Sequence, residues 1–308
     1  MKGKTILVTG GAGFIGSNIA NSLVDDNEVI VVDNEYLGDS ENLRPEVEFW
    51  NTSVLNDDLP TYGVDVVFHL AALSSYQMHE DDASEGAKVN VEGFVNTVEQ
   101  AYESGCDTVV YASTSSIYGS QTTPTAEDYR PEVNTGYEAS KMAREEYAEY
   151  FSNHYDMNMC GLRLFSVYQG ASEDHKGEFA NVITQFAQKI LDGKSPVLYG
   201  DGKQTRDFTH VDDIVDGFVL SAEKQLNGIY NVGTGERYSF LQVVDMLNEE
   251  FDKDIKPEFI ENPIPEDVYV HDTCADNAKL RDEGWEPDVT FEEGIQRVCE
   301  DLLEPIKQ

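Results

Sequence analysis

The sequence predicts an α/β fold built around a doubly wound parallel sheet. Short runs of β-branched and apolar residues alternate with segments whose apolar residues recur at helical spacing. Strands that alternate with helices in this way are joined by helical crossovers and lie parallel, with helices on both faces of the sheet. A glycine-rich segment follows the first apolar run, and it supplies the tight turn from the first strand into the first helix.

The expected elements follow in chain order. Residues 5–9 (TILVT) and 29–32 (VIVV) are predicted strands, and residues 14–23 between them have apolar side chains at helical spacing. Further strands are expected at residues 64–70, 108–112 and 157–165, and further helices at about residues 86–103, 137–153, 178–192 and 211–223. After about residue 166 the alternation loosens into loops and a tail that holds Pro263, Pro265 and Pro287. The regular α/β pattern therefore belongs to the N-terminal part of the chain.

This change of pattern predicts two regions. Residues 1–166 form a Rossmann-type domain, and residues 205–228 are expected to pack back onto it. Residues 167–204 and 229–308 form a smaller C-terminal region. The two regions are joined without a flexible linker, an internal repeat or a low-complexity tract.

The composition is strongly acidic. The 308 residues include 59 Asp and Glu against 21 Lys and Arg, which gives a formal net charge of −38, and 40% of the residues are hydrophobic. Nucleic acids and anionic membranes are poor partners for such a surface. Because salt screens the mutual repulsion of these charges, we expect a halophilic protein from a salt-rich cytosol.

The cysteines and the apolar runs bear on location. Cys106, Cys160, Cys274 and Cys299 show no CxxC spacing and no neighbouring histidine cluster, so neither a metal site nor a disulfide framework is expected. The N-terminal apolar stretch is too short for a signal peptide, and no apolar run is long enough to span a membrane. These features predict a cytoplasmic protein.

The glycine-rich turn is a candidate phosphate site. The segment TGGAGFIG places Gly10, Gly13 and Gly16 between the first strand and the first helix, where backbone amides can contact a pyrophosphate. Asp33 ends the second strand, where a carboxylate accepts hydrogen bonds from the adenosine ribose and repels a 2′-phosphate. NAD is therefore expected rather than NADP, although Arg44 downstream leaves NADP open.

The candidate catalytic residues lie in YEASK, residues 137–141. Tyr137 and Lys141 are four residues apart, so on a helix they share one face. A neighbouring ammonium and an oxidised nicotinamide both favour the phenolate, and we expect them to lower the pKa of Tyr137 toward working pH. Tyr137 is therefore a candidate general base, one loop after the hydroxyl-rich STSSIYG of residues 113–119.

These motifs, taken together, resemble one family over nearly the whole chain. It is the extended short-chain dehydrogenase/reductases that act on nucleotide sugars, especially the UDP-glucose 4-epimerases. The shared motifs are TGGAGFIG, VVDN, VFHLAA, KVNVEG, STSSIYG, YEASK, RLFSVY, LYGDGKQTRDFTHVDD and YNVGTG, in this order. The resemblance implies that the smaller C-terminal region binds the nucleotide sugar.

The resemblance also implies roles for individual residues. Thr114, Tyr137 and Lys141 match the catalytic hydroxyl, the general base and the lysine on the nicotinamide ribose. The positions that match the cofactor site are Gly10, Gly13, Phe14, Ile15, Gly16, Asp33, Asn34, Ser53, Val54, Leu70, Ala71, Ala72 and Asn90, with Tyr137 and Lys141. The positions that match the substrate site are Ser115, Ser116, Ser166, Lys176, Asn181, Val182, Tyr199, Arg206 and Thr273. Among these, Tyr199 is expected beside the base and Arg206 on the diphosphate.

The residues after Thr114 bear on the reaction. Dehydratases of this family carry carboxylates there for eliminating water, whereas this chain has Ser115 and Ser116. We therefore expect epimerisation at C4 of a UDP-glucose or UDP-galactose type of sugar through a transient 4-keto intermediate. A 4,6-dehydratase stays an alternative, as does an ADP-heptose-like 6-epimerase in which Lys176 is a second acid/base. The non-enzyme alternative is a catalytically silent, dinucleotide-sensing relative.

Several positions depart from the family pattern. Ser53 replaces an Asp that contacts adenine, Ser166 replaces an Asn that meets the substrate, and the segment VYVHDTCAD lacks a second diphosphate arginine. Thr273 is near a position that gates N-acetylated sugars, where a small residue leaves room for an acetamido group. The family also implies a homodimer, formed through the helices that carry Asn90 and Tyr137.

Overall fold

The computed structural model describes residues 1–121, 123–129, 133–169, 173, 177, 180–266 and 268–303. The contacts within the chain divide it into two units. Unit 1 comprises Met1–Ile117, Glu132–Leu164 and Ile214–Tyr230, and unit 2 comprises Tyr118–Pro131, Phe165–Asp213 and Asn231–Gln308. Residues 118–131 fall in unit 2 although they lie within the span 1–166, so the sequence-based domain boundaries stay a prediction.

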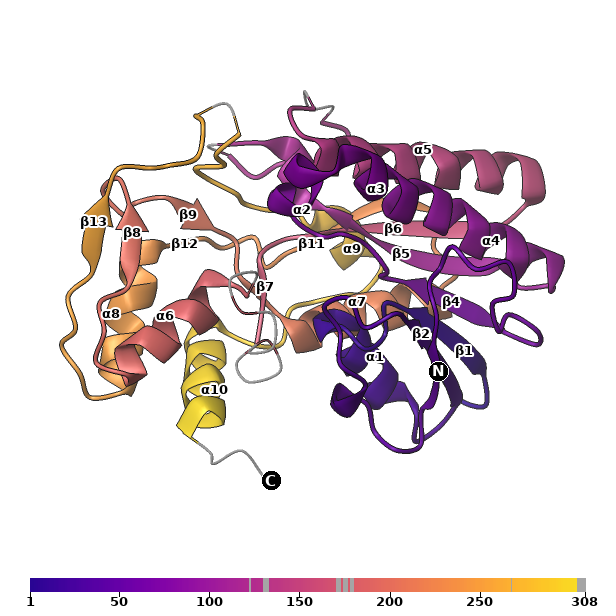
Figure 1. Cartoon of the computed structure of the whole chain (residues 1–308), viewed down its shortest axis with the longest axis horizontal. Helices are drawn as coiled ribbons and strands as arrows, with labels where there is room; N and C mark the ends of the chain where they lie inside the picture. The colour runs from indigo at the N-terminus through magenta and orange to yellow at the C-terminus, as the bar shows by residue number, and fades with distance from the viewer. Residues whose placement is uncertain are drawn as a thin grey trace. The chain divides into compact units, whose positions relative to one another are not determined.

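A seven-stranded sheet, in the order β11-β6-β5-β4-β1-β2-β3, is the framework of unit 1 (Figure 1). Its strands are β1 (Thr5–Thr9), β2 (Glu28–Asp33), β3 (Glu48–Asn51), β4 (Val66–His69), β5 (Thr108–Thr114), β6 (Asn158–Leu164) and β11 (Gly228–Val232). From β6 to β3 each neighbouring pair is parallel. The predicted doubly wound parallel sheet is therefore confirmed, and the carboxyl ends of β1, β2, β4 and β5 share one edge.

Helices cover both faces of this sheet. On one face lie α2 (Tyr76–Asp81), α3 (Ala83–Ala87), a π-helical turn η2 (Lys88–Glu92), α4 (Gly93–Glu103) and α5 (Gly136–Tyr155), and on the other α1 (Phe14–Leu23) (Figure 1). Helix α7 (Val211–Glu223) contacts the sheet where Phe218 packs edge-on against Phe68 of β4, at 5.9 Å between ring centroids. Phe94 and Val98 of α4 and Phe151 of α5 pack with Leu7, Val67 and Val109 of the strands. The burial of these apolar side chains fixes α4 and α5 against one face of the sheet.

Unit 2 has short paired strands and its own core. Its strands are β7 (Val167–Tyr168) with β10 (Thr209–His210), β8 (Val197–Tyr199) with β13 (Glu258–Ile260), and β9 (Thr205–Arg206) with β12 (Tyr238–Ser239). Its helices are α6 (Val182–Leu191), α8 (Phe240–Glu250), α9 (Ala278–Asp282) and α10 (Phe291–Leu303). Ile183, Phe186, Phe208, Phe240 and Ile295 meet in its core. The sequence reading predicted a helix at 178–192 but left α8 and α10 in a tail without elements.

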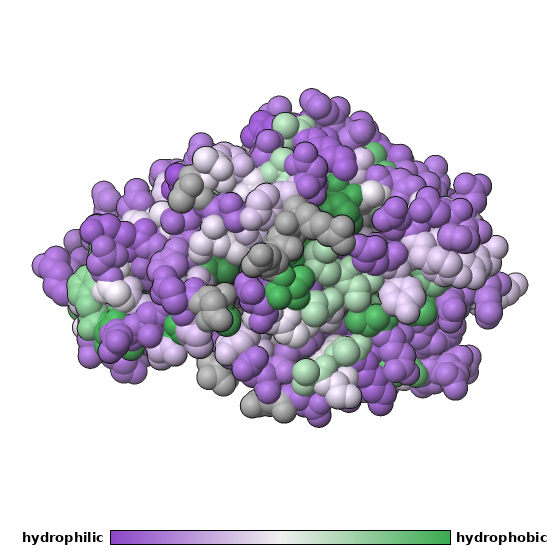
Figure 2. Space-filling view, turned by 90° about the horizontal axis from the view of Figure 1, so that it is seen from above, coloured by the Kyte–Doolittle hydropathy of each residue, from purple (hydrophilic) through white to green (hydrophobic). Residues whose placement is uncertain are grey.

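The surface agrees with the acidic composition. Figure 2 shows hydrophilic residues over most of the face that it presents, with small hydrophobic patches between them. In the described part of the chain, no helix is long and apolar enough to cross a membrane.

Candidate active site

The glycine turn between β1 and α1 has the shape that a dinucleotide phosphate needs. Gly10 has a φ of +67°, and a Cβ on it would lie 2.5 Å from the backbone nitrogen of Ala71. A Cβ on Gly16 would collide with the carbonyl oxygen of Gly10. Gly13 caps α1 in an extended conformation, and no side chain caps the first turn of the helix. The turn is a cradle that side chains would fill, at the N-terminus of a helix, so it fits a pyrophosphate.

Asp33 ends β2 beside this turn. Its carboxylate accepts hydrogen bonds from the backbone N–H of Ala12 at 3.1 Å and of Glu35 at 2.8 Å. Burial raises the pKa of Asp33, and these backbone hydrogen bonds oppose the shift. Arg44 is paired with Asp25 at 2.6 Å and with Glu46 at 3.4 Å. The charge of Arg44 is therefore neutralised by two carboxylates, which removes the reason to expect NADP. The site favours a free ribose hydroxyl beside Asp33.

Most of the other predicted cofactor residues lie at the same end of the sheet. Leu70, Ala71 and Ala72 follow β4 and are half-buried, and Ile15 is half-buried in the first turn of α1, where Phe14 is buried. Asn34 follows β2 and is exposed. Ser53 accepts a hydrogen bond from the N–H of Leu55 at 3.2 Å, and Val54 is buried. Their contacts to the cofactor stay a prediction.

Asn90 is fully buried in the π-helical turn. Its Oδ1 accepts from the N–H of Leu73 at 2.8 Å, and its Nδ2 donates to the carbonyl oxygen of Leu73 at 3.0 Å and to Ser140 Oγ at 2.9 Å. The side chain therefore holds the segment that follows β4 against α5. A direct role of Asn90 on the dinucleotide stays a prediction.

The three predicted catalytic residues come together where β5 ends and α5 begins. Lys141 Nζ lies 5.7 Å from the ring centroid of Tyr137 and donates to the carbonyl oxygen of Ala112 at 3.1 Å. The Thr114 side chain forms a hydrogen bond with the phenol of Tyr137. Tyr137 and Lys141 lie one turn apart on α5, as predicted, and β5 brings Thr114 to them.

Burial and neighbouring groups shift the pKa values of Tyr137 and Lys141. Burial raises the pKa of Tyr137, while the hydrogen bond from Thr114 and the charge of Arg144 lower it. Burial and the charge of Arg144 hold the pKa of Lys141 well below its usual value. Desolvation outweighs attraction for these buried groups in the protein without cofactor. The predicted lowering of the pKa of Tyr137 also requires the positive charge of an oxidised nicotinamide, so it stays a prediction.

The sequence reading missed two residues of this site. Arg144, on the same face of α5, is fully buried and donates to three backbone carbonyl groups. The ring of His79 in α2 meets that of Tyr137 edge-on at 5.7 Å between centroids, and its Nε2 lies 3.2 Å from the carbonyl oxygen of Leu73. Arg144 is seven residues after Tyr137, and this helical spacing was the available signal. The sequence held no comparable signal for His79.

The hydroxyls of residues 113–116 have separate contacts. Ser113 Oγ donates to Glu145 Oε1 at 2.5 Å, and Glu145 forms a buried ion pair with Arg163 at 2.7 Å. Thr114 Oγ1 lies 3.1 Å from Ser116 Oγ and accepts from the backbone N–H of Ser116. Ser115 is buried. Thr114 is thus the hydroxyl beside the phenol, while Ser113 belongs to a structural network.

Unit 2 carries the residues that were predicted to hold the substrate. The guanidinium of Arg206 donates to the carbonyl oxygens of Thr205 at 2.8 Å, Val270 at 2.5 Å and His271 at 3.0 Å. It lies 5.4 Å from the ring centroid of Phe240 and 5.9 Å from that of Tyr269. Burial lowers the pKa of Arg206. Among the described residues Arg206 forms no ion pair, so its charge is fixed by carbonyl groups and aromatic rings.

The remaining predicted substrate residues differ in their burial and in their contacts. The ring of Tyr199 lies 6.2 Å from that of Tyr269. Asn181 caps α6 by accepting from the N–H of Ile183, and Val182 begins that helix. Thr273 is buried and accepts from the N–H of Asp207 at 3.2 Å, while Ser166 is half-buried before β7. Lys176 lies outside the described residues.

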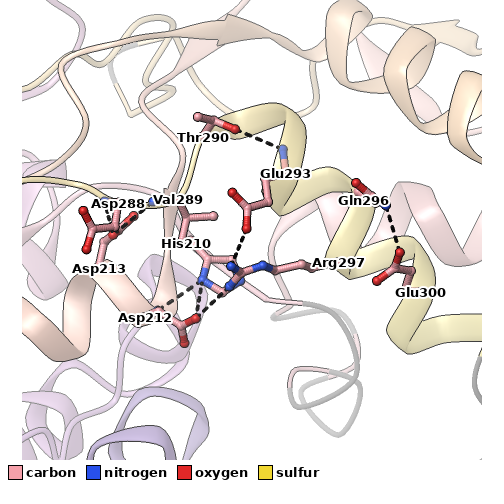
Figure 3. Close-up of polar contacts among 10 residues, drawn as sticks. All are labelled: His210, Asp212, Asp213, Asp288, Val289, Thr290, Glu293, Gln296, Arg297 and Glu300. Atoms are coloured by element: carbon pink, nitrogen blue, oxygen red, sulfur yellow. Dashed lines mark hydrogen bonds and ion pairs between the residues drawn. The ribbon is translucent and has the colours of Figure 1, made fainter.

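A second polar cluster lies at the start of α7, in unit 2. His210 is buried and its Nδ1 accepts from the N–H of Asp212, whose carboxylate receives a hydrogen bond from Arg297 at 2.9 Å (Figure 3). Arg297 also donates to Glu293 at 2.5 Å. Asp213 accepts from the N–H of Asp288 at 2.7 Å (Figure 3). These bonds hold the start of α7 against α10 and the segment before it, and they indicate a structural cluster.

The parallel sheet, the glycine turn and the Thr114–Tyr137–Lys141 group define a dinucleotide-dependent enzyme of the short-chain dehydrogenase type. The chain belongs to the NAD dependent epimerase/dehydratase family, whose model matches residues 6–233. The predictions of this family, of an NAD-dependent nucleotide-sugar epimerase type of enzyme and of NAD as its cofactor are therefore confirmed.

Individual relatives are similar over nearly their whole length. The UDP-glucose 4-epimerase of Mycolicibacterium smegmatis is 34% identical in an alignment 308 positions long, gaps included, that covers 96% of this chain and 97% of the relative. The structure of the UDP-N-acetylglucosamine 4-epimerase from Methanobrevibacter ruminantium, in complex with UDP-N-acetylmuramic acid, is 31% identical with a TM-score of 0.91 and covers 98% of this chain and 99% of that one. The structure of the UDP-glucose 4-epimerase from Thermotoga maritima with UDP-glucose is 32% identical with a TM-score of 0.91, and it covers 97% of this chain and 98% of that one.

Proposed function

We propose that the protein interconverts UDP-sugars of the UDP-glucose and UDP-galactose type by epimerisation at C4. The observation that carries this proposal is the group of Thr114, Tyr137 and Lys141 at the end of β5, followed by hydroxyls at residues 115 and 116. Relatives that are named as 4-epimerases and are similar over nearly the whole chain support it.

The proposed reaction begins with Tyr137. The phenolate takes the proton of the C4 hydroxyl, and Thr114 shares that proton through its hydrogen bond to the phenol. Bound NAD would supply the hydride acceptor and donor for C4. Tyr137 would return its proton to the C4 oxygen once the transient 4-keto sugar has turned over, so the proton is conserved and no water or other co-reactant is consumed. Lys141, fixed at the carbonyl oxygen of Ala112, is placed to hold the nicotinamide ribose.

The nucleotide part of the substrate is assigned to unit 2. We assign the diphosphate to Arg206, because its guanidinium is fixed by three backbone carbonyl groups and is not neutralised by an ion pair among the described residues. Tyr199 is assigned to the base. The solved relatives with UDP-glucose and with UDP-N-acetylmuramic acid support a uridine nucleotide.

One experiment tests the reaction and the sugar together. The purified protein, loaded with NAD in high salt, is incubated with UDP-glucose, UDP-galactose and their acetamido forms, and the products are identified by NMR. We expect C4 epimers, and Tyr137→Phe should keep NAD and lose conversion. A 4-keto-6-deoxy product would select the 4,6-dehydratase, and conversion by Tyr137→Phe at the wild-type rate would overturn the mechanism.

The acceptance of N-acetylated sugars is a separate part of the proposal. Thr273 is small and buried, and its hydroxyl accepts from the N–H of Asp207. We propose that it leaves room for an acetamido group, so UDP-glucose and UDP-N-acetylglucosamine should turn over at comparable rates. Thr273→Tyr should reject the acetamido sugar selectively, and rejection already by the wild-type protein would end this part.

We also propose a cytoplasmic homodimer. The exposed Tyr102 of α4 and Tyr147 and Tyr150 of α5 offer apolar area on the two helices that were predicted to pair. The four cysteines are buried and lie outside any disulfide, which suits a reducing compartment. Sedimentation at high and low KCl tests the dimer, and a monomer at both concentrations would contradict it.

A further inference from the structure

Arg144 is an unusual cation because it is fully buried and is held by backbone groups. Its Nε and Nη2 donate to the carbonyl oxygen of Asn90 at 3.2 and 3.0 Å. Its Nη1 donates to Ala112 at 3.1 Å, and Nη2 donates to Ala71 at 3.1 Å. The guanidinium carbon lies 5.4 Å from the ring centroid of Phe94. Among the described residues no carboxylate pairs with it.

A second buried arginine of unit 1 shows the contrast. Arg163 of β6 forms an ion pair with Glu145 at 2.7 Å, and both side chains are buried. Burial of the unpaired Arg144 lowers its pKa to about 10, so at neutral pH it still carries its charge. A buried charge without an ion-pair partner destabilises the folded protein unless neighbouring groups stabilise the charge. The carbonyl groups satisfy its hydrogen bonds but do not cancel its net charge.

The carbonyl groups that Arg144 binds belong to the walls of the site. Ala71 is the residue whose backbone Gly10 approaches so closely that a Cβ would collide with it. Ala112 also accepts from Lys141 Nζ at 3.1 Å. Asn90 lies in the π-helical turn. Arg144 therefore connects the helix of Tyr137 with the glycine turn and with the strand that ends in Thr114.

We propose that Arg144 is a positioning residue whose fixed buried charge favours the phenolate form of Tyr137. The inference rests on the proposed function only in taking Tyr137 as the general base. In support, Arg144 Nη1 and Lys141 Nζ donate to the same carbonyl oxygen of Ala112, and Lys141 Nζ lies 5.7 Å from the ring centroid of Tyr137. The charge of Arg144 also lowers the pKa of Tyr137. With a pKa of about 10, Arg144 keeps its positive charge at neutral pH.

Other ionisable groups also face this pair. They are His69 of β4, His79 of α2, Tyr111 of β5, and Glu138, Lys141 and Glu145 of α5. The test must therefore isolate the titration of Tyr137 from the rest. The tyrosinate absorbance of the NAD-loaded protein, minus that of the same protein with Tyr137→Phe, gives this signal without any sugar.

The test compares two substitutions of Arg144 that disturb its packing to a similar extent but differ in charge. Arg144→Gln removes the charge and keeps amide donors, and we expect the Tyr137 titration and the acid limb of kcat/KM to move up by about one pH unit. On that limb the rate falls about tenfold. Arg144→Lys keeps a positive charge and should shift the Tyr137 titration and the acid limb by a small fraction of the shift in Arg144→Gln. Arg163→Lys, a buried arginine paired with Glu145, is the matched control and should leave the titration in place.

Each outcome bears on the inference. An unchanged titration in Arg144→Gln, with a lowered melting temperature, would show a purely structural role and overturn it. Equal shifts in the Gln and Lys variants would overturn it as well. If Arg144→Gln does not fold, Arg144→Met carries the same expectation, because an apolar side chain packs beside Phe94. A shift without any epimerase activity in the wild-type protein would leave the inference standing and reject the proposed function.

Discussion

Tyr137 is subject to opposing influences at the residue scale. Burial favours the neutral phenol, while the Thr114 hydroxyl and the charge of Arg144 favour the phenolate. Because the base works deprotonated, activity should rise as the pH increases through the pKa of Tyr137 in the folded protein. Any group that raises this pKa therefore lowers activity at neutral pH.

Thr114→Val removes the hydroxyl and keeps the shape of the side chain. Loss of the hydrogen bond should raise the pKa of Tyr137 and lower kcat about 100-fold, with a small change in KM. Steady-state rates across pH check this. Thr114→Ser is the control and should keep most of the activity, and an equal loss in both variants would point to packing rather than to the hydroxyl.

Gly10→Ala tests the contact between the glycine turn and the segment after β4. The added Cβ would lie 2.5 Å from the backbone nitrogen of Ala71 at a φ of +67°, so bound NAD should be lost. The NAD content of the purified protein and calorimetric titration measure this. Gly63→Ala is the matched control, because Gly63 has a φ of +76° and open space around it. Equal NAD affinity in the two variants would contradict the cradle.

At the scale of elements, the start of α5 positions the base. Thr135 Oγ1 accepts from the N–H of Glu138, and the Glu138 side chain accepts from the N–H of Thr135. This capping box fixes the first turn, in which Tyr137 is the second residue of the helix. The cap therefore influences both the stability of unit 1 and the geometry of the reacting group.

Thr135→Ala should lower the free energy of unfolding by about 1 kcal/mol and reduce kcat as well. Ser239→Ala is the matched control, since Ser239 and Gln242 form the same capping box at the start of α8 in unit 2. The two variants should lose similar stability in chemical denaturation, while only Thr135→Ala affects the rate. A wild-type kcat in Thr135→Ala would show that the cap does not influence the reaction.

The elements also show what the sequence could predict. β-Branched runs and helical spacing predicted β1, β2, β4, β5, β6 and the helices α1, α4 and α5, because their burial imposes the period. The short helix α2 was not predicted. The strand β3 (EFWN) is short and mostly exposed, so it carries no such period. Helix α8 was missed although SFLQ at residues 239–242 spells a capping box.

The candidate site was predictable to the extent that motifs define it. Tyr137, Lys141 and Thr114 come together as expected, since helical spacing and a strand end determine their positions. The balance of burial and charge was not predictable, because it depends on residues such as His79 that reach the site from elsewhere in the chain. Burial raises the pKa of Tyr137 in the protein without cofactor, and the predicted lowering by Lys141 together with an oxidised nicotinamide stays a prediction.

At the scale of the whole molecule, the net charge of −38 dominates. Carboxylates spread over the chain repel one another most at low ionic strength, where the Debye length is about 10 Å or more. The charges of Asp25, Asp192 and Asp201 are paired locally with Arg44, Lys194 and Lys203, but there are too few basic residues to pair most of the others. The halophilic character stays a prediction that salt can test.

The melting temperature should therefore rise steadily from low to molar KCl. Thermal unfolding at several KCl concentrations measures this, and sucrose at matched osmolarity controls for effects other than screening. Stability that is undiminished at low salt would contradict salt adaptation and leave a protein that is acidic without depending on salt.

The hydrogen bonds of Arg144 also determine when the site can exist. They join residues that are 73, 54 and 32 positions apart in the chain. Local helices form quickly, but contacts over such separations require the sheet to be assembled first. During refolding, helical structure should thus appear before the charge beside Tyr137 is in place. Catalytic competence is a late product of folding, and a partly folded chain cannot carry out the chemistry prematurely.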